Sequence, residues 1–132
     1  MPNDTKSPQD WSTHEAFDLL PDSVRAVLPR LYSQENVPDP TVHVRLFFPA
    51  GKYTAYIVEG QNEGTDDAQE WILFGYVINM ESEFGYISLN ELQELRAFGG
   101  LRMERDLSFT PKPLSQALKA DRHSPHRADL DD

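Results

Sequence analysis

The sequence contains no cysteine and no long apolar run. Without cysteine the chain can form no disulfide, no thiolate zinc site and no cysteine nucleophile. No apolar segment approaches the roughly 20 residues that are needed to span a bilayer. The N-terminal segment MPNDTKSPQDW lacks the apolar core of a signal peptide. We therefore expect a cytoplasmic protein that does not contact a membrane.

Lysine and arginine are absent from residues 53–95, although the whole chain has 12 of them beside 22 acidic residues. The formal net charge is −10, and a surface of this charge repels nucleic acid. Two interpretations of the base-free stretch stay open: a solvated face that aids solubility, or a surface that binds a basic partner. The stretch holds nine acidic residues: Glu59, Glu63, Asp66, Asp67, Glu70, Glu81, Glu83, Glu91 and Glu94.

Motifs for catalysis and for cofactor binding are absent as well. The sequence has no G-x-S-x-G nucleophile motif, no phosphate-binding G-x-x-x-x-G-K and no dinucleotide fingerprint. The four histidines, His14, His43, His123 and His126, form no pattern that would bring three or four zinc ligands together on ordered elements. We expect no metal ion and no cofactor.

The length of 132 residues and the 39% hydrophobic content fit one folded domain. Residues 1–17 are polar and contain two prolines, so we predict a flexible arm. Residues 115–132 are charged and nearly free of apolar side chains towards their end, so burial cannot offset the entropy of ordering them. We predict a disordered charged tail there, and a single domain over residues 18–114.

Local patterns within 18–114 predict an α+β fold. A short helix is expected after Pro21, and four strands are expected over 41–48, 53–59, 71–78 and 83–87. A second helix begins at Ser88, which forms a capping box with Glu91, and an extended segment follows over 101–109. We expect an antiparallel meander sheet of four to five strands, with the N-terminal and C-terminal helices packed on it.

Two details of these strands are expected from the side chains. In 41–48 the apolar residues alternate with Thr41, His43, Arg45 and Phe47, which places Arg45 on the face away from the core. Gly75, inside the apolar run 71–78, indicates a bulge or a close approach of another backbone.

Carboxylates are the only candidate catalytic groups. Glu59 is expected at the end of one strand, Glu83 at the start of another, and Asp106 follows Arg105 in the last segment. If these strand ends converge, the four residues form a polar cluster in which Glu59, Glu83 and Asp106 could share acid and base roles. We favour the alternative that Arg105 forms a salt bridge with one of the nearby acids and ties the last segment to the sheet.

Aromatic residues offer a second candidate site. Tyr53 and Tyr56 could stack the bases of a single strand if they lie on an exposed sheet. That mode also needs basic neighbours, and only Arg45 and Lys52 are close in sequence. Core packing is the favoured role, and direct nucleic-acid binding is not expected. The other rings weighed in this way are Trp71, Phe74, Tyr76, Phe84 and Tyr86.

A series of short motifs resembles a bacterial family known as domain of unknown function 2958. The series runs through VRLFFPAGKYTAYIVEG, LFGYV, EFGYISLNELQELR and ERDLSFTPKPL, and it covers residues 19–114. The stretch 53–56 (YTAY) stands where the family often has a tryptophan-containing segment. The resemblance implies a gene carried by plasmids and other mobile DNA. It implies no activity, cofactor or catalytic residue.

These observations favour a non-enzymatic accessory domain of a mobile genetic element that binds a basic protein or nucleoprotein complex. In a more specific form it is an acidic inhibitor of a host defence complex. A single-stranded nucleic-acid-binding protein and a carboxylate-dependent hydrolase are the alternatives. The sequence does not indicate an oligomeric state. The expected acidic surface consists of Glu63, Asp66, Asp67, Glu70, Glu81, Glu91 and Glu94.

Overall fold

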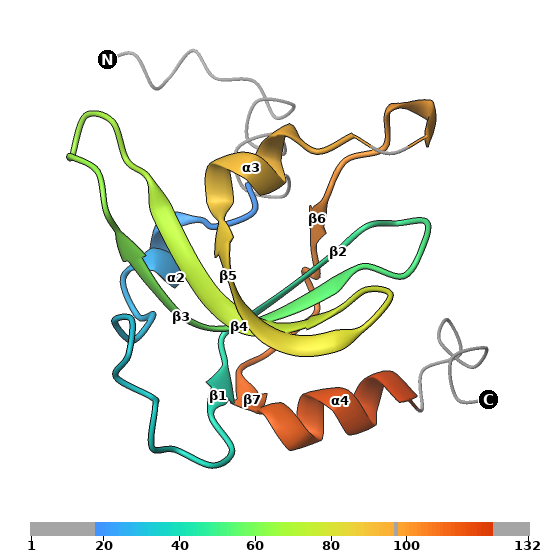
Figure 1. Ribbon diagram of the computed structural model, residues 1–132, viewed down its shortest axis with the longest axis horizontal. Coiled ribbons are helices and arrows are strands. Elements are labelled where there is room, and N and C mark those ends of the chain that lie inside the picture. The colour runs from blue at the N-terminus through green and yellow to red at the C-terminus, as the bar shows by residue number, and fades with distance from the viewer. Residues whose placement is uncertain (1–17, 97, 123–132) are drawn as a thin grey trace.

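The fold is built on a five-stranded antiparallel sheet, seen in a computed structural model that describes residues 18–96 and 98–122 (Figure 1). The strand order is β5-β4-β3-β2-β6, so four strands that follow one another in sequence form a meander and β6 returns beside β2. The predicted α+β meander is confirmed. The predicted arm over 1–17 and residues 123–132 of the predicted tail lie outside the described residues. The strands are β2 (Val44–Phe47), β3 (Thr54–Asn62), β4 (Trp71–Ile78), β5 (Ser82–Ser88) and β6 (Glu104–Arg105).

The segment predicted as one strand over 41–48 is divided in two. β1 (Thr41–Val42) leaves the main sheet and pairs with β7 (Lys112–Pro113), and β2 begins after His43. The His43 N–H still donates to the Ile57 carbonyl at 2.9 Å, which keeps the junction close to β3. The division lets a segment from the end of the chain join the fold.

One face of the sheet packs against the N-terminal segment and α3 (Leu89–Glu94). The buried residues there include Leu20, Leu46, Ile57 and Leu92. The Ser88 half of the predicted capping box is confirmed, since Ser88 Oγ accepts the Glu91 N–H at 3.2 Å. Helix α2 (Asp22–Arg25) is a single turn, and η2 (Phe98–Gly100) is a short 3-10 turn after α3.

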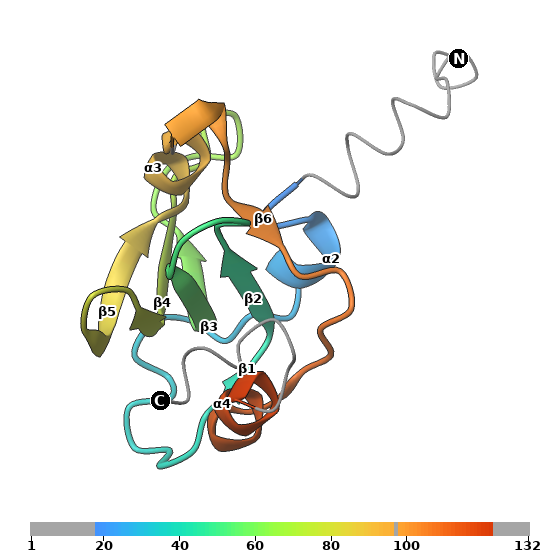
Figure 2. The same cartoon turned by 90° about the vertical axis from the view of Figure 1, so that its right-hand side faces the viewer.

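The opposite face is covered by α4 (Leu114–Arg122), which Figures 1 and 2 place at the far end of the molecule from α3. Leu114 and Ala117 of α4 are buried against Tyr56 and Val58 of β3. The prediction of a disordered tail from residue 115 is therefore wrong as far as Arg122. Three apolar positions at helical spacing, completed by Leu118, are enough to hold this helix on the sheet.

Candidate functional site

The four polar residues proposed as a cluster do not converge. Glu83 lies on β5 and Arg105 on β6, which are the two opposite edges of the sheet, while Glu59 lies on the central strand β3. Asp106 directly follows β6. The carboxylates are thus separated by the width of the sheet and form no shared acid–base site.

Glu59 is buried, with 2% of the residue exposed, and it is turned by a bulge in β3. Ile57 pairs with Gly75 and Glu59 pairs with Phe74, so Val58 is the extra residue. The bulge moves Glu59 away from the face that carries Ile57 and onto the face that carries Phe74. Strand β3 then continues to Asn62, so the prediction that Glu59 ends a strand is wrong.

The Glu59 carboxylate is held by backbone donors. Oε1 accepts the Tyr32 N–H at 2.8 Å and Oε2 accepts the Gln34 N–H at 2.7 Å. Alternate backbone N–H groups in a turn make a concave site for an anion, and here that anion is a side chain of the same protein. Tyr32 has φ 73°, and no other non-glycine residue in the described part of the chain has a positive φ. Each carboxylate oxygen accepts one backbone N–H, so Glu59 anchors the turn around Tyr32.

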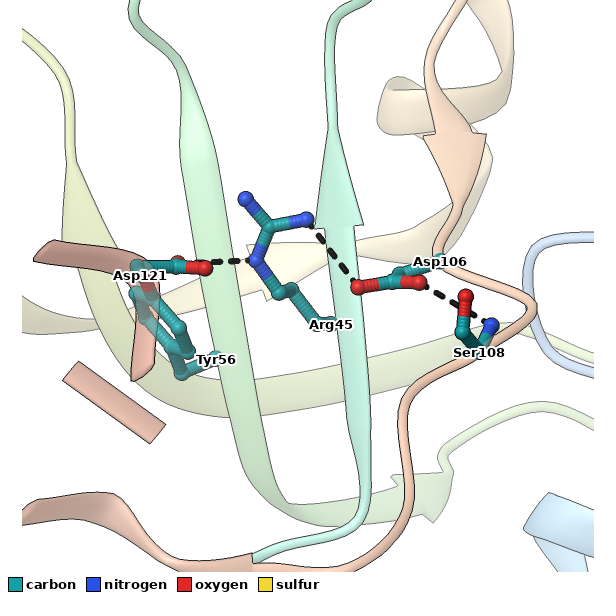
Figure 3. A network of polar contacts seen from close by, with 5 residues as sticks. All are labelled: Arg45, Tyr56, Asp106, Ser108 and Asp121. Carbon is teal, nitrogen blue, oxygen red and sulfur yellow. Dashed lines mark hydrogen bonds and ion pairs between the residues drawn. The ribbon is translucent and has the colours of Figure 1, made fainter. Parts of the chain in front are cut away.

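Asp106 belongs to a second buried polar group, centred on Arg45 (Figure 3). The Arg45 side chain is only 10% exposed. Its Nε donates to Asp121 Oδ2 at 2.9 Å and its Nη1 donates to Asp106 Oδ2 at 3.3 Å. The Tyr56 hydroxyl donates to the same Asp121 oxygen. The network joins β2, β3, the segment after β6 and α4.

The electrostatics of this network keep its donors protonated. Burial raises the pKa of Tyr56, and the hydrogen bond to Asp121 raises it further. Burial alone would lower the pKa of Arg45, but the nearby Asp121 carboxylate outweighs it, so the pKa is raised. Arg45 therefore stays cationic and Tyr56 stays a hydroxyl donor at neutral pH. The expectation that Arg45 faces away from the core is wrong, because Arg45 is buried and supplies two ion pairs.

Arg105 makes a backbone contact from β6, and its predicted salt bridge with a nearby acid stays a prediction. Its Nε donates to the backbone carbonyl of Asp18 at 2.8 Å, which connects β6 to the start of the described chain. The contact supports the β6 edge of the sheet from the N-terminal side.

The tyrosines proposed for base stacking are not exposed. Tyr56 is fully buried, and Tyr53 is half-buried with its ring 6.1 Å from that of Phe48. Among the described residues the exposed rings belong to Tyr32, Phe84 and Tyr86, which are 59%, 45% and 54% exposed. Core packing was the favoured role for Phe84 and Tyr86, and Tyr32 was not predicted because its turn is held by Glu59, 27 residues away in sequence.

These rings form an aromatic patch on the outer part of the sheet. The Phe84 ring stacks on Phe74 at 5.6 Å between centroids, and Tyr86 lies 4.8 Å from Phe74 and 6.1 Å from Tyr32. Tyr76 adds an edge contact to Phe84 at 5.2 Å. We use "aromatic patch" for Tyr32, Phe74, Tyr76, Phe84 and Tyr86.

A groove lies on the opposite face of the same strands, between β5 and α3. Its volume is about 480 Å³, and its floor includes Val77, Gly85 and Ile87, with Leu92 and Leu95 of α3 beside them. Met80, the most exposed of the large apolar side chains described (95% exposed), lies beside it at the β4–β5 turn. We call this feature the β5 groove; its acidic rim is Glu81, Glu83 and Glu91.

Strand β5 itself forms an open edge. It pairs with β4 on one side, and no strand of the described chain pairs with it on the other. Alternate backbone N–H and C=O groups of its seven residues therefore point away from the sheet. All acids of the base-free stretch except Glu59 are exposed, and three of them, Glu81, Glu83 and Glu91, line the β5 groove. Among the described residues none of the exposed ones takes part in an ion pair.

The other large hollow, of about 1040 Å³, lies beside β6. Its lining is of mixed charge, because Arg25, Arg102 and Arg105 lie beside three acids.

Within 18–96 and 98–122 no helix has the length and apolar character to cross a membrane. In those same ranges no group of three or more histidine and acidic side chains is placed to hold a metal ion.

Comparison of the sequence with models of known protein families identifies the family of the chain. A family model described as "Protein of unknown function (DUF2958)" matches residues 19–126. The chain belongs to the DUF2958 family. The matched region extends beyond residue 114, so in this DUF2958 member α4 is part of the family domain. No curated protein and no solved structure matches the chain.

Proposed function

We propose that this DUF2958 protein is a non-enzymatic accessory domain of a mobile genetic element. It acts in the cytoplasm and binds a basic protein or nucleoprotein complex through the side of the sheet formed by β4 and β5. In the more specific form of the proposal, its carboxylates occupy the basic groove of a host defence complex and inhibit it. The family resemblance supports the mobile-element setting, and the surface of the molecule supports the binding role.

One observation carries the proposal: the exposed acids of the base-free stretch have no cationic partner within the described chain. Eight exposed carboxylates lie in the β3–β4 loop, at the β4–β5 turn, on β5 and on α3. A protein gains no folding stability from such unpaired like charges, which repel one another. They favour encounter with a positively charged surface, which would neutralise them.

The two alternatives have less support from the geometry. The exposed rings of Phe84 and Tyr86 could stack bases, but no lysine or arginine occurs anywhere in residues 53–95 to hold the phosphates. The carboxylates proposed for hydrolysis lie on different strands, and Glu59 and Asp106 are committed to structural contacts.

The proposal is tested by capture of partners with the tagged full chain from a lysate of its host cell, at low and at high salt. We expect basic proteins that are retained at low salt and released at high salt, because exposed charge pairs are screened. Each retained protein is then purified, and its affinity for the chain is measured directly. A defence complex among them is assayed for loss of activity.

Charge-matched variants locate the contact. Glu81→Gln with Glu83→Gln should weaken the purified complex, whereas Asp22→Asn with Glu104→Gln removes two exposed charges elsewhere and should leave the affinity nearly unchanged. Absence of any salt-sensitive basic partner, or equal losses in both double variants, would contradict the proposal.

A further inference from the structure

The geometry points to strand addition as the mode of binding: we propose that β5 takes up an extended segment of the partner, rich in arginine or lysine, as a sixth strand of the sheet. This inference rests on the proposed function, since it names how a basic partner would bind. Three features of β5 support it: its open backbone, its groove and its rings.

The open backbone is the first feature. β5 has seven residues, long enough to bind a peptide through main-chain hydrogen bonds alone. Proteins normally protect such an edge with lysine, proline, a very short strand or a covering loop. Strand β5 has no lysine and no proline, and the described residues include no segment that pairs with its outer side. A strand added here would satisfy the outer N–H and C=O groups.

The second feature is the place of Gly85 in the β5 groove. An added Cβ at Gly85 would meet no atom within 4 Å, so the strand does not need glycine for packing reasons at this position. The missing side chain leaves the β5 groove open towards the edge. An apolar side chain of an added strand can reach across Gly85 towards Val77 and Leu92, and the carboxylates of Glu81 and Glu83 attract the basic segment to this edge through their charge.

The third feature is the aromatic patch on the other face of β5. Side chains alternate between faces along a strand, so every second residue of the added segment would lie beside Phe84 and Tyr86. An arginine there would lie against exposed rings, a favourable cation–π arrangement. The two faces of β5 thus favour alternating apolar and basic side chains in the bound segment.

Charge decides between this partner and a second copy of the chain. Two β5 edges brought together would join two copies of β4 and β5, strands that contain no lysine or arginine, in a protein of net charge −10. The repulsion opposes pairing of copies and favours a basic segment. A dimer held through β5 in solution would overturn the inference.

The test uses a seven-residue peptide with capped ends that alternates valine and arginine, the length of β5. Two further peptides carry N-methyl groups, one on all the valines and one on all the arginines. Only one alternate set of amides can hydrogen-bond to β5, so one methylated peptide should lose binding and the other should keep it. Affinities are measured by calorimetry with the full chain. A peptide with glutamate in place of arginine should not bind.

Two variants connect the binding to the site. Gly85→Val should weaken binding of the unmodified peptide about tenfold, because it closes the β5 groove, while circular dichroism confirms the fold. Glu81→Gln with Glu83→Gln should weaken it by a similar factor. The charge-matched control, Asp66→Asn with Asp67→Asn, lies in the loop at the other end of β4 and should have an effect of about twofold or less. Hydrogen exchange should show new protection at alternate amides of β5.

The outcomes separate the two proposals. If the basic peptide binds in a salt-sensitive way but both methylated peptides bind equally, strand addition is wrong and the role as a binder of basic partners stands. If no basic peptide binds at low salt, strand addition is wrong, and capture of a basic protein from lysate then tests the broader function independently.

Discussion

The two edges of the sheet differ in what holds them. At the β6 edge a two-residue strand is secured by contacts from distant parts of the chain: Arg45 pairs with Asp106 and Asp121, and Arg105 binds the Asp18 carbonyl. At the β5 edge a seven-residue strand pairs with β4 only, among the described residues, and the exposed acids Glu81 and Glu83 take part in no ion pair there. The ion pairs of the described residues therefore lie on the side of β2, β6 and α4, whereas the β5 edge has open backbone groups and exposed acids.

The sharpest way to test the comparison is a pair of glycines that face each other across β4 and β5. Gly75 and Gly85 are partners in register. A Cβ at Gly75 would lie 2.2 Å from the Tyr56 carbonyl oxygen, whereas a Cβ at Gly85 would meet nothing within 4 Å. We expect Gly75→Ala to lower the free energy of unfolding by more than about 3 kcal/mol, because backbone must move to relieve the contact.

Gly85→Ala is the matched control for that substitution. It should change stability by less than about 0.5 kcal/mol, and alanine even reduces the entropy of the unfolded chain. Urea denaturation of both variants measures the difference. Similar losses in the free energy of unfolding of the two variants would show that β5 is packed as tightly as β4. That result would contradict the open character of the β5 edge.

Removing the cation at the secured edge should have the next largest effect. Arg45→Met leaves Asp121 and Asp106 partly buried without their cation, so we expect a loss of roughly 2–4 kcal/mol, below the full value for a buried pair because Asp106 is 26% exposed. Urea denaturation gives the loss, and the amides of α4 should exchange faster because Asp121 no longer ties the helix to β2.

The control for Arg45 lies at the open edge. Glu83→Gln removes an exposed charge that takes part in no ion pair within the described residues, and it should alter stability by less than about 0.5 kcal/mol. A loss at Glu83 as large as that at Arg45 would mean that the two edges are equally important for folding.

Glu59 tests the one buried acid of the base-free stretch. In Glu59→Gln one carboxylate oxygen becomes an NH₂ group, which cannot accept the Tyr32 or Gln34 N–H, so we expect a loss of about 1–3 kcal/mol. Exposed Glu63→Gln is the control and should be nearly neutral. If Glu59→Gln is also neutral, the turn at Tyr32 is not held by the carboxylate, and the aromatic patch does not depend on it.

The sequence predicts most strongly what neighbouring residues determine. The alternating strands and the Ser88 cap of α3 arise from local patterns, and both were found. Helix α4 was missed because its stability depends on contacts that are remote in sequence: Asp121 pairs with Arg45, 76 residues away, and Leu114 packs against Tyr56. The apolar spacing of Leu114, Ala117 and Leu118 was the only signal for it.

The candidate site was harder to predict than the fold. The exposed acids were predicted from the sequence, but Glu59 was assigned to a polar cluster. The bulge at Val58, which moves Glu59 to the other face of β3, has no local signal in the sequence. The β5 edge is open because of the order of all five strands, which no single segment of the sequence indicates. Gly75 is different: its place inside an apolar run predicted the close backbone approach that the structure shows.

The smallest expected effect is a dependence of stability on pH from His43, at the junction of β1 and β2. Burial lowers the pKa of His43 below its ordinary value of 6.5, and its buried Nδ1 has no hydrogen-bond partner in the described structure. Below pH 6.5 the unfolded chain therefore binds a proton that the folded chain resists. The contribution of His43 to the free energy of unfolding is fully present above pH 6.5 and declines as the pH falls below it.

In His43→Gln the decline in the free energy of unfolding between neutral and mildly acidic pH should be shallower than in the wild type, as measured by urea denaturation at each pH. Because the other histidines and all carboxylates are the same in both proteins, the difference between the two curves isolates His43. Identical curves would mean that protonation of His43 is tolerated in the folded state, and that the strand junction on the secured side of the sheet opens more readily than its contacts indicate.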